Sequence, residues 1–325
     1  MCTEERYIVE KKLNDLIDKA LSRRKFLAGA GTAAAGAMMI GCNNSTPAPT
    51  TTPTPTPTPL DIPDNDILNF ALNLEYLEAE FYLYAATGSG LSSADALSGA
   101  GTTTLPANFA AVPWGTPAPG MNIQQFANEL AQTELDHVRF LQKAITSNSG
   151  TPVPRPAIDL SFFGPLATTA GITNPSPFNP FASPAAFLIG AFTFEDVGVT
   201  AYAGAAPLIT NSNILSAGAG LQATEAYHAG GIRTLIVATD FAAGNLTYTT
   251  IANQVSALRA TLGGGNETAL GTMSIVAANA SNAVGFSRTT DQVLHIVYGA
   301  AGGAGLAKGG FFPNGMNGNI TVTAS

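Results

Sequence analysis

Apolar residues recur every three or four positions along four long segments of the chain, which is the spacing of one face of an α-helix. They rarely alternate with a period of two, so strands are not expected. The four segments run from about Asp64 to Ala86, Asn122 to Ser147, Ser183 to Leu208 and Ile214 to Ala243. Segments of roughly 20 to 30 residues suit a helical bundle. The pattern therefore predicts an all-α fold.

The lengths of the connections predict how these helices are joined. Only a few residues separate the third segment from the fourth, so those two helices should be antiparallel neighbours. Two stretches rich in Gly, Ser, Thr and Pro, at about 87–121 and 148–182, exceed the usual loop length. The second of them lies where a four-helix bundle would need a long crossover.

Additional C-terminal helices are predicted beyond Gly244. The periodicity indicates one from about Thr249 to Leu262, a second from about Thr268 to Ser281 and a third from about Thr289 to Ala301. The glycine-rich tail from Gly302 onward is expected to be coil.

The first 42 residues have the composition of a targeting segment. Ser22-Arg23-Arg24-Lys25-Phe26-Leu27 resembles a twin-arginine export signal, which implies the twin-arginine export machinery as a partner. The small-residue apolar run from Ala28 to Gly41 is shorter than the roughly 20 residues that a membrane span needs. The alternative is an ordinary surface charge pair followed by a core helix.

The residues around Cys42 suggest a lipid anchor. Met39-Ile40-Gly41-Cys42 resembles a lipobox, with Met where Leu is usual, so Cys42 would be lipidated and tether the protein to a membrane. The Thr-Pro alternation that follows favours extended polyproline II rather than a packed core. We thus expect an export signal at 1–42, a linker at 43–59 and a globular domain with a C-terminal extension at 60–325, in the periplasm or cell envelope.

Charge and cysteine content exclude several functions for the main body. From residue 43 onward the chain has 7 basic and 17 acidic residues, a net charge of −10, so it should repel nucleic acid and anionic lipid. Its two cysteines, Cys2 and Cys42, both precede the body. A disulfide, a thiolate metal site and a cysteine nucleophile are excluded there.

Two of the three histidines follow a glutamate by three residues, in Glu134-Leu-Asp-His137 and Glu225-Ala-Tyr-His228. On a helix such residues lie on one face, so each motif offers a carboxylate and an imidazole to one point. Both motifs continue apolar stripes that should face the core. A buried carboxylate needs a compensating charge, and Arg139 and Arg233 lie off these stripes, so a metal ion is the best counter-charge.

The other two bundle helices also carry acidic candidates. Glu75 and Glu78 share a line with Tyr82 on the first helix, whereas Glu80 points away, and Glu195 is the candidate on the third, with Tyr202 along its stripe. The order along the chain is therefore Glu, Glu-x-x-His, Glu, Glu-x-x-His.

This order resembles the ferritin-like di-iron and di-manganese carboxylate bundles, over about residues 64–243. The segment LNFALNLEYLEAEFY, with QVLHIVYG and GGFFPNGMNG near the end, resembles more narrowly the ferritin-like group of desiccation-related proteins. The resemblance implies two Fe or Mn ions per chain, with Glu134 and Glu225 bridging them. The full implied ligand set is Glu75, Glu134, His137, Glu195, Glu225 and His228, with Glu78 as an alternative to Glu75 or a nearby acid.

An oxygen-rich set of this kind suits Fe or Mn better than Cu(I) or structural Zn. The chemistry expected is ferrous oxidation, or reaction with oxygen or peroxide, in a di-metal oxidoreductase that is ferroxidase-like or manganese-catalase-like and serves stress protection. The sequence does not choose between these reactions. The alternative is an envelope-tethered stress-protective or binding protein whose metal site is structural or empty.

Other polar and aromatic residues have simpler interpretations. Glu129 and Glu80 are expected on the solvated helix surface, and His295 is expected to be a hydrogen-bonded helix residue rather than a ligand. Four tyrosines are interpreted as core aromatics, one of which could donate a hydrogen bond near the site: Tyr76, Tyr82, Tyr202 and Tyr227.

Overall fold

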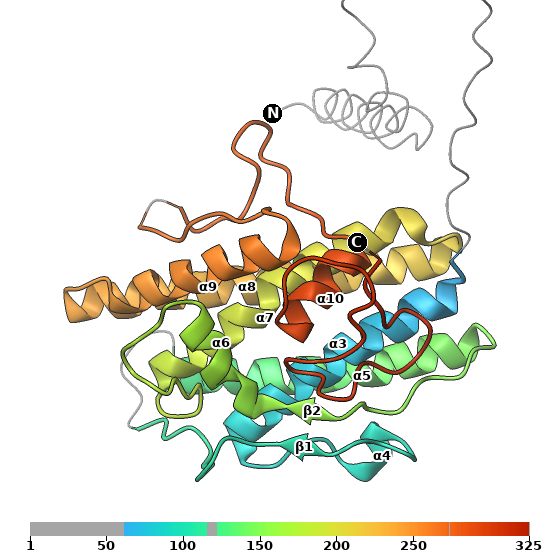
Figure 1. Cartoon of the computed structure of the whole chain (residues 1–325), viewed down its shortest axis with the longest axis horizontal. Helices are drawn as coiled ribbons and strands as arrows, with labels where there is room; N and C mark the ends of the chain where they lie inside the picture. The colour runs from blue at the N-terminus through green and yellow to red at the C-terminus, as the bar shows by residue number, and fades with distance from the viewer. Residues whose placement is uncertain (1–61, 116–121, 273, 325) are drawn as a thin grey trace, which may run out of the picture. The chain divides into compact units, whose positions relative to one another are not determined.

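Four long helices form the centre of the protein (Figure 1). The computed structural model describes residues 62–115, 122–272 and 274–324, all within one compact unit. Helix α3 packs along α5, α7 packs along α8, and α3 also contacts α7. The predicted all-α four-helix bundle is thereby confirmed. Its helices are α3 (Asp64–Thr87), α5 (Ile123–Ser147), α7 (Pro184–Ala205) and α8 (Ser212–Ala243).

Local sequence signals explain where these helices begin and end. Helix α3 starts after Pro63 and ends at Gly88, whose φ of 79° is the left-handed conformation that glycine adopts at little cost. The Ser183 side chain accepts a hydrogen bond from a backbone N–H in the first turn of α7, and Asn211 does the same for α8. The short 3-10 helix η2 (Ala206–Leu208) separates α7 from α8.

The long crossover between α5 and α7 contains short elements that the sequence pattern did not predict. Strand β2 (Ile158–Asp159) pairs in parallel with β1 (Thr103–Thr104), and η1 (Leu160–Phe162) and α6 (Phe163–Thr169) follow β2. The small helix α4 (Ser93–Ala96) lies in the other long loop and contacts α5. The two proline-rich loops are thus held against each other.

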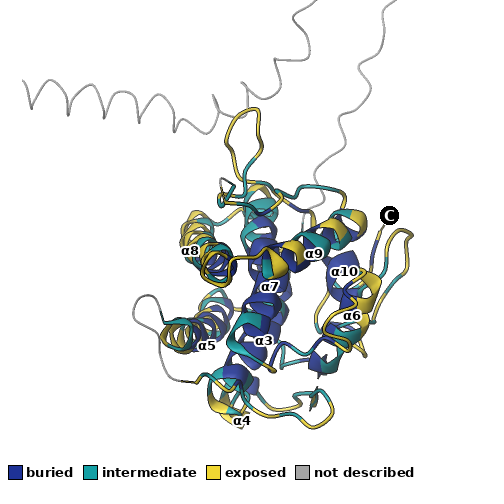
Figure 2. Ribbon diagram, turned by 90° about the vertical axis from the view of Figure 1, so that its left-hand side faces the viewer, coloured by how far each residue is buried: buried dark blue, intermediate teal, exposed yellow. Residues whose placement is uncertain are grey.

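Two C-terminal helices cover α7 on the side away from α5 (Figures 1 and 2). They are α9 (Thr247–Gly263) and α10 (Thr290–Tyr298), close to two of the three predicted C-terminal helices.

The prediction of a helix at Thr268–Ser281 is wrong, because the described residues there are irregular. Arg233 donates to the carbonyls of Thr268, Ser274 and Ile275, which a helix would use for its own hydrogen bonds.

The core is deepest around α3 and α7, which are the most buried bundle helices, while α5 and α8 each expose one side (Figure 2).

Helix α7, with η2, is the one described helix long and apolar enough to cross a membrane, but 83% of its most apolar window is buried inside the protein. The C-terminal tail lacks long helices and still packs on the core through Phe311, Phe312 and Met316. The predictions for Arg23, Arg24, Cys42 and the Thr-Pro linker lie outside the described residues.

Candidate metal centre

The four bundle helices bring six acidic and histidine side chains together in the core. Each of these residues is at most 6% exposed. Helices α3 and α7 contribute one carboxylate each, and α5 and α8 each contribute one Glu-x-x-His motif. The six are Glu75, Glu134, His137, Glu195, Glu225 and His228.

The candidate ligand atoms form two overlapping groups, and within each group all atoms lie within 4.8 Å of one another. One group holds Glu75 and His137, and the other holds Glu195 and His228. Glu134 and Glu225 belong to both groups. This is the arrangement expected of two carboxylates shared between two ions. Glu78 belongs to neither group, so the geometry favours Glu75 in the choice between the two.

The two imidazoles occupy equivalent places in these groups. The Nδ1 atom of His137 lies 3.2 Å from a Glu75 oxygen, 3.1 Å from a Glu134 oxygen and 3.4 Å from a Glu225 oxygen. The Nδ1 atom of His228 lies 2.9 Å from the other Glu134 oxygen and 3.4 Å from a Glu195 oxygen. Glu134 therefore directs one oxygen toward each group.

Several buried polar atoms of the site make no hydrogen bond. They are Oε1 of Glu134, Oε2 of Glu195, both carboxylate oxygens of Glu225 and Nδ1 of His228. The pair of Glu134 Oε1 and His228 Nδ1 is close, but it lies off the hydrogen-bonding direction. Buried polar atoms normally have hydrogen-bond partners. The clustering of atoms without partners at this site therefore fits ligands that point at a metal ion.

Gly198 on α7 makes room for Glu225. A Cβ atom at this position would lie 2.1 Å from Glu225 Oε2, closer than atoms can approach, and 3.6 Å from an oxygen of Glu78. Alanine or any larger residue would displace the Glu225 carboxylate. The sequence analysis did not single out this glycine, because only the approach of α8 to α7 reveals its role.

Burial of so many carboxylates in one place favours their protonated forms. Burial raises the pKa of Glu75 to about 7 and, together with the charge of Glu134, raises the pKa of Glu225 well above its usual range. Burial opposes ionisation of Glu134 too, but the adjacent His137 and His228 imidazoles outweigh it and lower the Glu134 pKa. Burial alone would lower the pKa of His228, but Glu195 and Glu134 raise it to about 11. Metal ions would replace these protons.

Two tyrosines hydrogen-bond to the site. The Tyr82 hydroxyl donates to Oε1 of Glu195, and the Tyr202 hydroxyl donates to Oε1 of Glu75. Sequence reasoning expected one tyrosine near the site at most. Tyr76 is buried as expected, but Tyr227 is 81% exposed, so its prediction as a core residue was wrong.

The remaining predicted residues lie away from the site. Glu129 is exposed as predicted, and His295 is a buried helix residue whose Nδ1 lies 2.8 Å from the Ala300 carbonyl oxygen. The prediction that Glu80 is solvated was wrong: it is fully buried and forms an ion pair with Arg155. The loop that follows α3 covers it, and the Leu91 N–H donates to its carboxylate.

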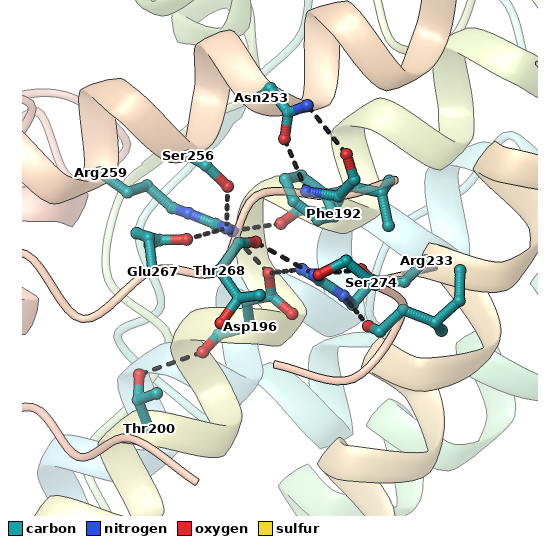
Figure 3. Close-up of polar contacts among 12 residues, drawn as sticks. Phe192, Asp196, Thr200, Arg233, Asn253, Ser256, Arg259, Glu267, Thr268 and Ser274 are labelled. Atoms are coloured by element: carbon teal, nitrogen blue, oxygen red, sulfur yellow. Dashed lines mark hydrogen bonds and ion pairs between the residues drawn. The ribbon is translucent and has the colours of Figure 1, made fainter. Parts of the chain in front are cut away.

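The buried arginines have carboxylate partners elsewhere (Figure 3). Arg233 and Arg259 both bind Asp196, while Arg259 and Arg288 both bind Glu267. In the described part of the chain, the site carboxylates have the two histidines as their ion-pair partners and no arginine or lysine. The geometry, the unpartnered atoms and the charge balance thus all fit a metal pair.

Comparison with known proteins agrees with this arrangement. Residues 63–238 match the family model of the ferritin-like domain. The chain belongs to the ferritin-like family.

Two curated proteins are similar over long stretches. The desiccation-related protein PCC13-62 of Craterostigma plantagineum is 32% identical over 213 residues, which is 62% of this chain and 64% of that protein. The chain therefore matches somewhat less than two thirds of that relative's length. The ferritin-like catalase Nec2 of Nesocodon mauritianus is 27% identical over 286 residues, which is 80% of this chain and 86% of that protein.

Proposed function

We propose that this protein holds two Fe or Mn ions on its six core ligands and uses them to disproportionate hydrogen peroxide. The observation that carries the proposal is the pair of overlapping ligand groups, in which Glu134 and Glu225 are common to both. Four carboxylates and two imidazoles form a hard, oxygen-rich set, which suits Fe or Mn. Glu134 and Glu225 would hold both ions, because they belong to both groups.

The reaction converts two molecules of hydrogen peroxide into two of water and one of dioxygen. When bound, the metal pair supplies the two electrons that one peroxide accepts and the next returns. The residues of the chain hold the ions, exclude water and move protons. Glu134 and Glu225 would hold both ions, and the surrounding core excludes bulk water. Glu78, 5% exposed, lies beside Gly198 at the edge of the ligand set, where it can exchange a proton with peroxide.

Similarity to the ferritin-like catalase favours peroxide over ferrous iron as the substrate. That relative aligns with 80% of this chain, well beyond the bundle alone. The match is therefore longer than the stretch 63–238 that the family model covers.

The second candidate function is stress protection by a tethered binding protein whose metal site is structural or empty. The similarity to a desiccation-related protein favours it. The two candidates differ in metal content and turnover, so one preparation distinguishes them.

The test is elemental analysis of full-length protein from its native host, followed by peroxide and ferrous-oxidation assays on the same sample. We expect about two Fe or Mn per chain and one dioxygen released for every two peroxides consumed. Glu134→Gln should lose metal and activity together, whereas Glu129→Gln, an exposed glutamate on the same helix, should keep both. Native protein that is folded but contains no metal would contradict the proposal. Ferrous oxidation without peroxide turnover would also contradict it and would indicate a ferroxidase.

We further propose export through the twin-arginine pathway and lipid attachment at Cys42, on the strength of the Ser22–Leu27 and Met39–Cys42 motifs. Export of the folded protein would allow metal loading in the cytoplasm, where supply is controlled, and protect a weakly binding metal from replacement by Cu or Zn. The double change Arg23→Lys, Arg24→Lys should leave the protein in the cytoplasm, and Cys42→Ser should release it from membranes. Unchanged fractionation of both variants would contradict the proposal.

A further inference from the structure

A cavity of about 180 Å³ lies between α7, α8 and the irregular segment that joins α9 to α10. None of the six candidate metal ligands lines this cavity, so it is separate from the metal centre. An engineered cavity of about 150 Å³ in another protein holds one benzene molecule. The cavity is therefore large enough for a small organic molecule.

The walls of the cavity carry an excess of positive charge. Arg233 of α8 and Arg288 of the irregular segment line it, and Arg259 of α9 belongs to the same ion-pair network (Figure 3). Asp196 pairs with Arg233 and Arg259. Glu267 pairs with Arg259 and Arg288. Among the described residues, three arginines thus share two carboxylates, which leaves one positive charge without a carboxylate.

These three arginines are buried, so water does little to compensate the excess charge. Each of them is at most 2% exposed. Burial, together with the charge of Arg259, lowers the pKa of Arg288, as expected for a cation whose charge is not fully compensated. A buried ion without a partner is strongly destabilising. An anion bound in the cavity would remove this cost.

Both arginines that line the cavity have hydrogen-bond donors left. The Nη1 atom of Arg288 donates to Thr200 Oγ1 over 2.7 Å, and the Nη1 atom of Arg233 donates to Asp196 Oδ2 over 2.9 Å. Thr200 and Asp196 also line the cavity. Each Nη1 atom carries two N–H groups, and the described residues accept one from each. One N–H of each arginine is therefore left for a ligand.

Much of the remaining wall is apolar, which favours an organic anion over an inorganic one. An organic anion would bury its own apolar surface against these side chains, whereas an inorganic ion would gain nothing from them. The excess of one positive charge matches an anion with one negative charge. The apolar side chains are those of Val199, Ala226, Ala229, Ile275, Val276 and Phe286.

We propose that this cavity binds a small organic monocarboxylate, whose carboxylate bridges Arg233 and Arg288 and whose apolar part packs against α8 and residues 275–276. The ligand supplies the negative charge that the arginine network lacks. Arginine and carboxylate are a favoured pair, because the planar guanidinium donates charge-assisted hydrogen bonds to both carboxylate oxygens. The proposal does not depend on the metal pair, since the two sites share no residue.

The test is isothermal titration calorimetry of the full-length protein with sodium benzoate at constant ionic strength. Benzamide is the matched control ligand, because it has nearly the same shape and no charge. We expect one benzoate bound per chain, and binding of benzamide weaker by about tenfold or more, because hydrogen bonds between charged groups are the stronger ones. Sodium chloride and sodium phosphate, titrated in the same way, test for an inorganic anion.

Two variants test the location of the site. Arg288→Gln leaves two arginines for two carboxylates, and Glu267 keeps Arg259 as its partner, so benzoate affinity should fall by about tenfold or more. Ala226→Phe fills the cavity from a residue that is exposed, so it should block benzoate even if Arg288→Gln does not fold. Ala238→Phe is the control, an exposed alanine of α8 that does not line the cavity.

Four results would overturn the proposal. These are no benzoate binding, equal binding of benzoate and benzamide, binding of chloride or phosphate alone, and wild-type affinity in both Arg288→Gln and Ala226→Phe. Glu134→Gln should bind benzoate as the wild-type protein does, and a loss of binding in that variant would place benzoate on the metal ions instead. Native protein without metal that still binds benzoate would contradict the proposed function and leave the carboxylate site standing.

Discussion

Gly198 is the residue on which the geometry of the metal centre depends most sharply. A Cβ atom there would lie 2.1 Å from Glu225 Oε2. We predict that Gly198→Ala weakens metal binding by at least about tenfold and costs about 1 to 3 kcal/mol in unfolding free energy, because the carboxylate must move. Gly230→Ala on α8 is the matched control, since nothing lies within 4 Å of its added atom. Full metal content in Gly198→Ala, measured by elemental analysis, would contradict this account of the site.

The protons held in the metal-free site predict how metal affinity depends on pH. The pKa of Glu75 is raised to about 7 and that of His228 to about 11, so at pH 6 both residues are largely protonated before metal binds. Metal must displace these protons, and each displaced proton tightens binding by about tenfold per pH unit. Chelator competition should therefore show tighter binding at pH 8 than at pH 6, with protons released into a weakly buffered solution. An affinity that is constant over this range would show that the ligands bind without losing protons.

At the residue scale, sequence predicts what is local to one helix. Glu134 and His137 share a face because of the helical repeat alone, so the pattern in the chain is enough to find them. The bond from Tyr82 to Glu195 depends on how α3 and α7 align, and no spacing in the sequence states that. Glu80 was misjudged because the loop that follows α3 folds back over it, which the helical repeat does not reveal.

At the scale of elements, the buried ion-pair network fastens the irregular segment between α9 and α10 to the bundle (Figure 3). Arg233 on α8 binds Asp196 on α7 as well as three carbonyls of that segment. Apolar periodicity predicted a helix in this segment, but its carbonyl groups instead accept hydrogen bonds from a side chain that is remote in sequence. Tertiary contacts of this kind override local helix preference.

Breaking this network should be costly. Asp196→Ala leaves Arg233 and Arg259 buried without this carboxylate, so we predict a loss of about 3 to 5 kcal/mol in unfolding free energy. Arg139→Ala, which removes an ion pair with Asp95 from a half-exposed side chain, should cost about 1 kcal/mol or less. Urea denaturation of both variants measures the difference. Similar losses would show that the network contributes no more than a surface pair.

At the scale of the whole molecule, the six candidate ligands come from all four bundle helices. Their number, order and long crossover follow from apolar periodicity and loop composition, which is why the bundle itself could be predicted. The packing of α9 and α10 could not, because α9 contacts α7, α8 and α10, and α10 contacts α7 and α9. No spacing in the sequence states such contacts between elements.

Because only the folded bundle assembles all six ligands, metal should stabilise the fold. At a free-ion concentration about 100 times the dissociation constant, the gain is about 2.7 kcal/mol for one site. Calorimetry should therefore show a melting temperature several degrees higher with Mn²⁺ or Fe²⁺ than after chelation. Glu134→Gln should abolish the increase. An equal melting temperature with and without metal in the wild-type protein would argue against binding to the folded state.

The most direct measurement is anomalous X-ray scattering from crystals of the native protein, with data collected on both sides of the iron and manganese absorption edges. The account predicts two peaks of one of these elements, roughly 3.5 to 4 Å apart, each beside one histidine and both between Glu134 and Glu225. A single peak, a peak of another element or no peak at this position would contradict it.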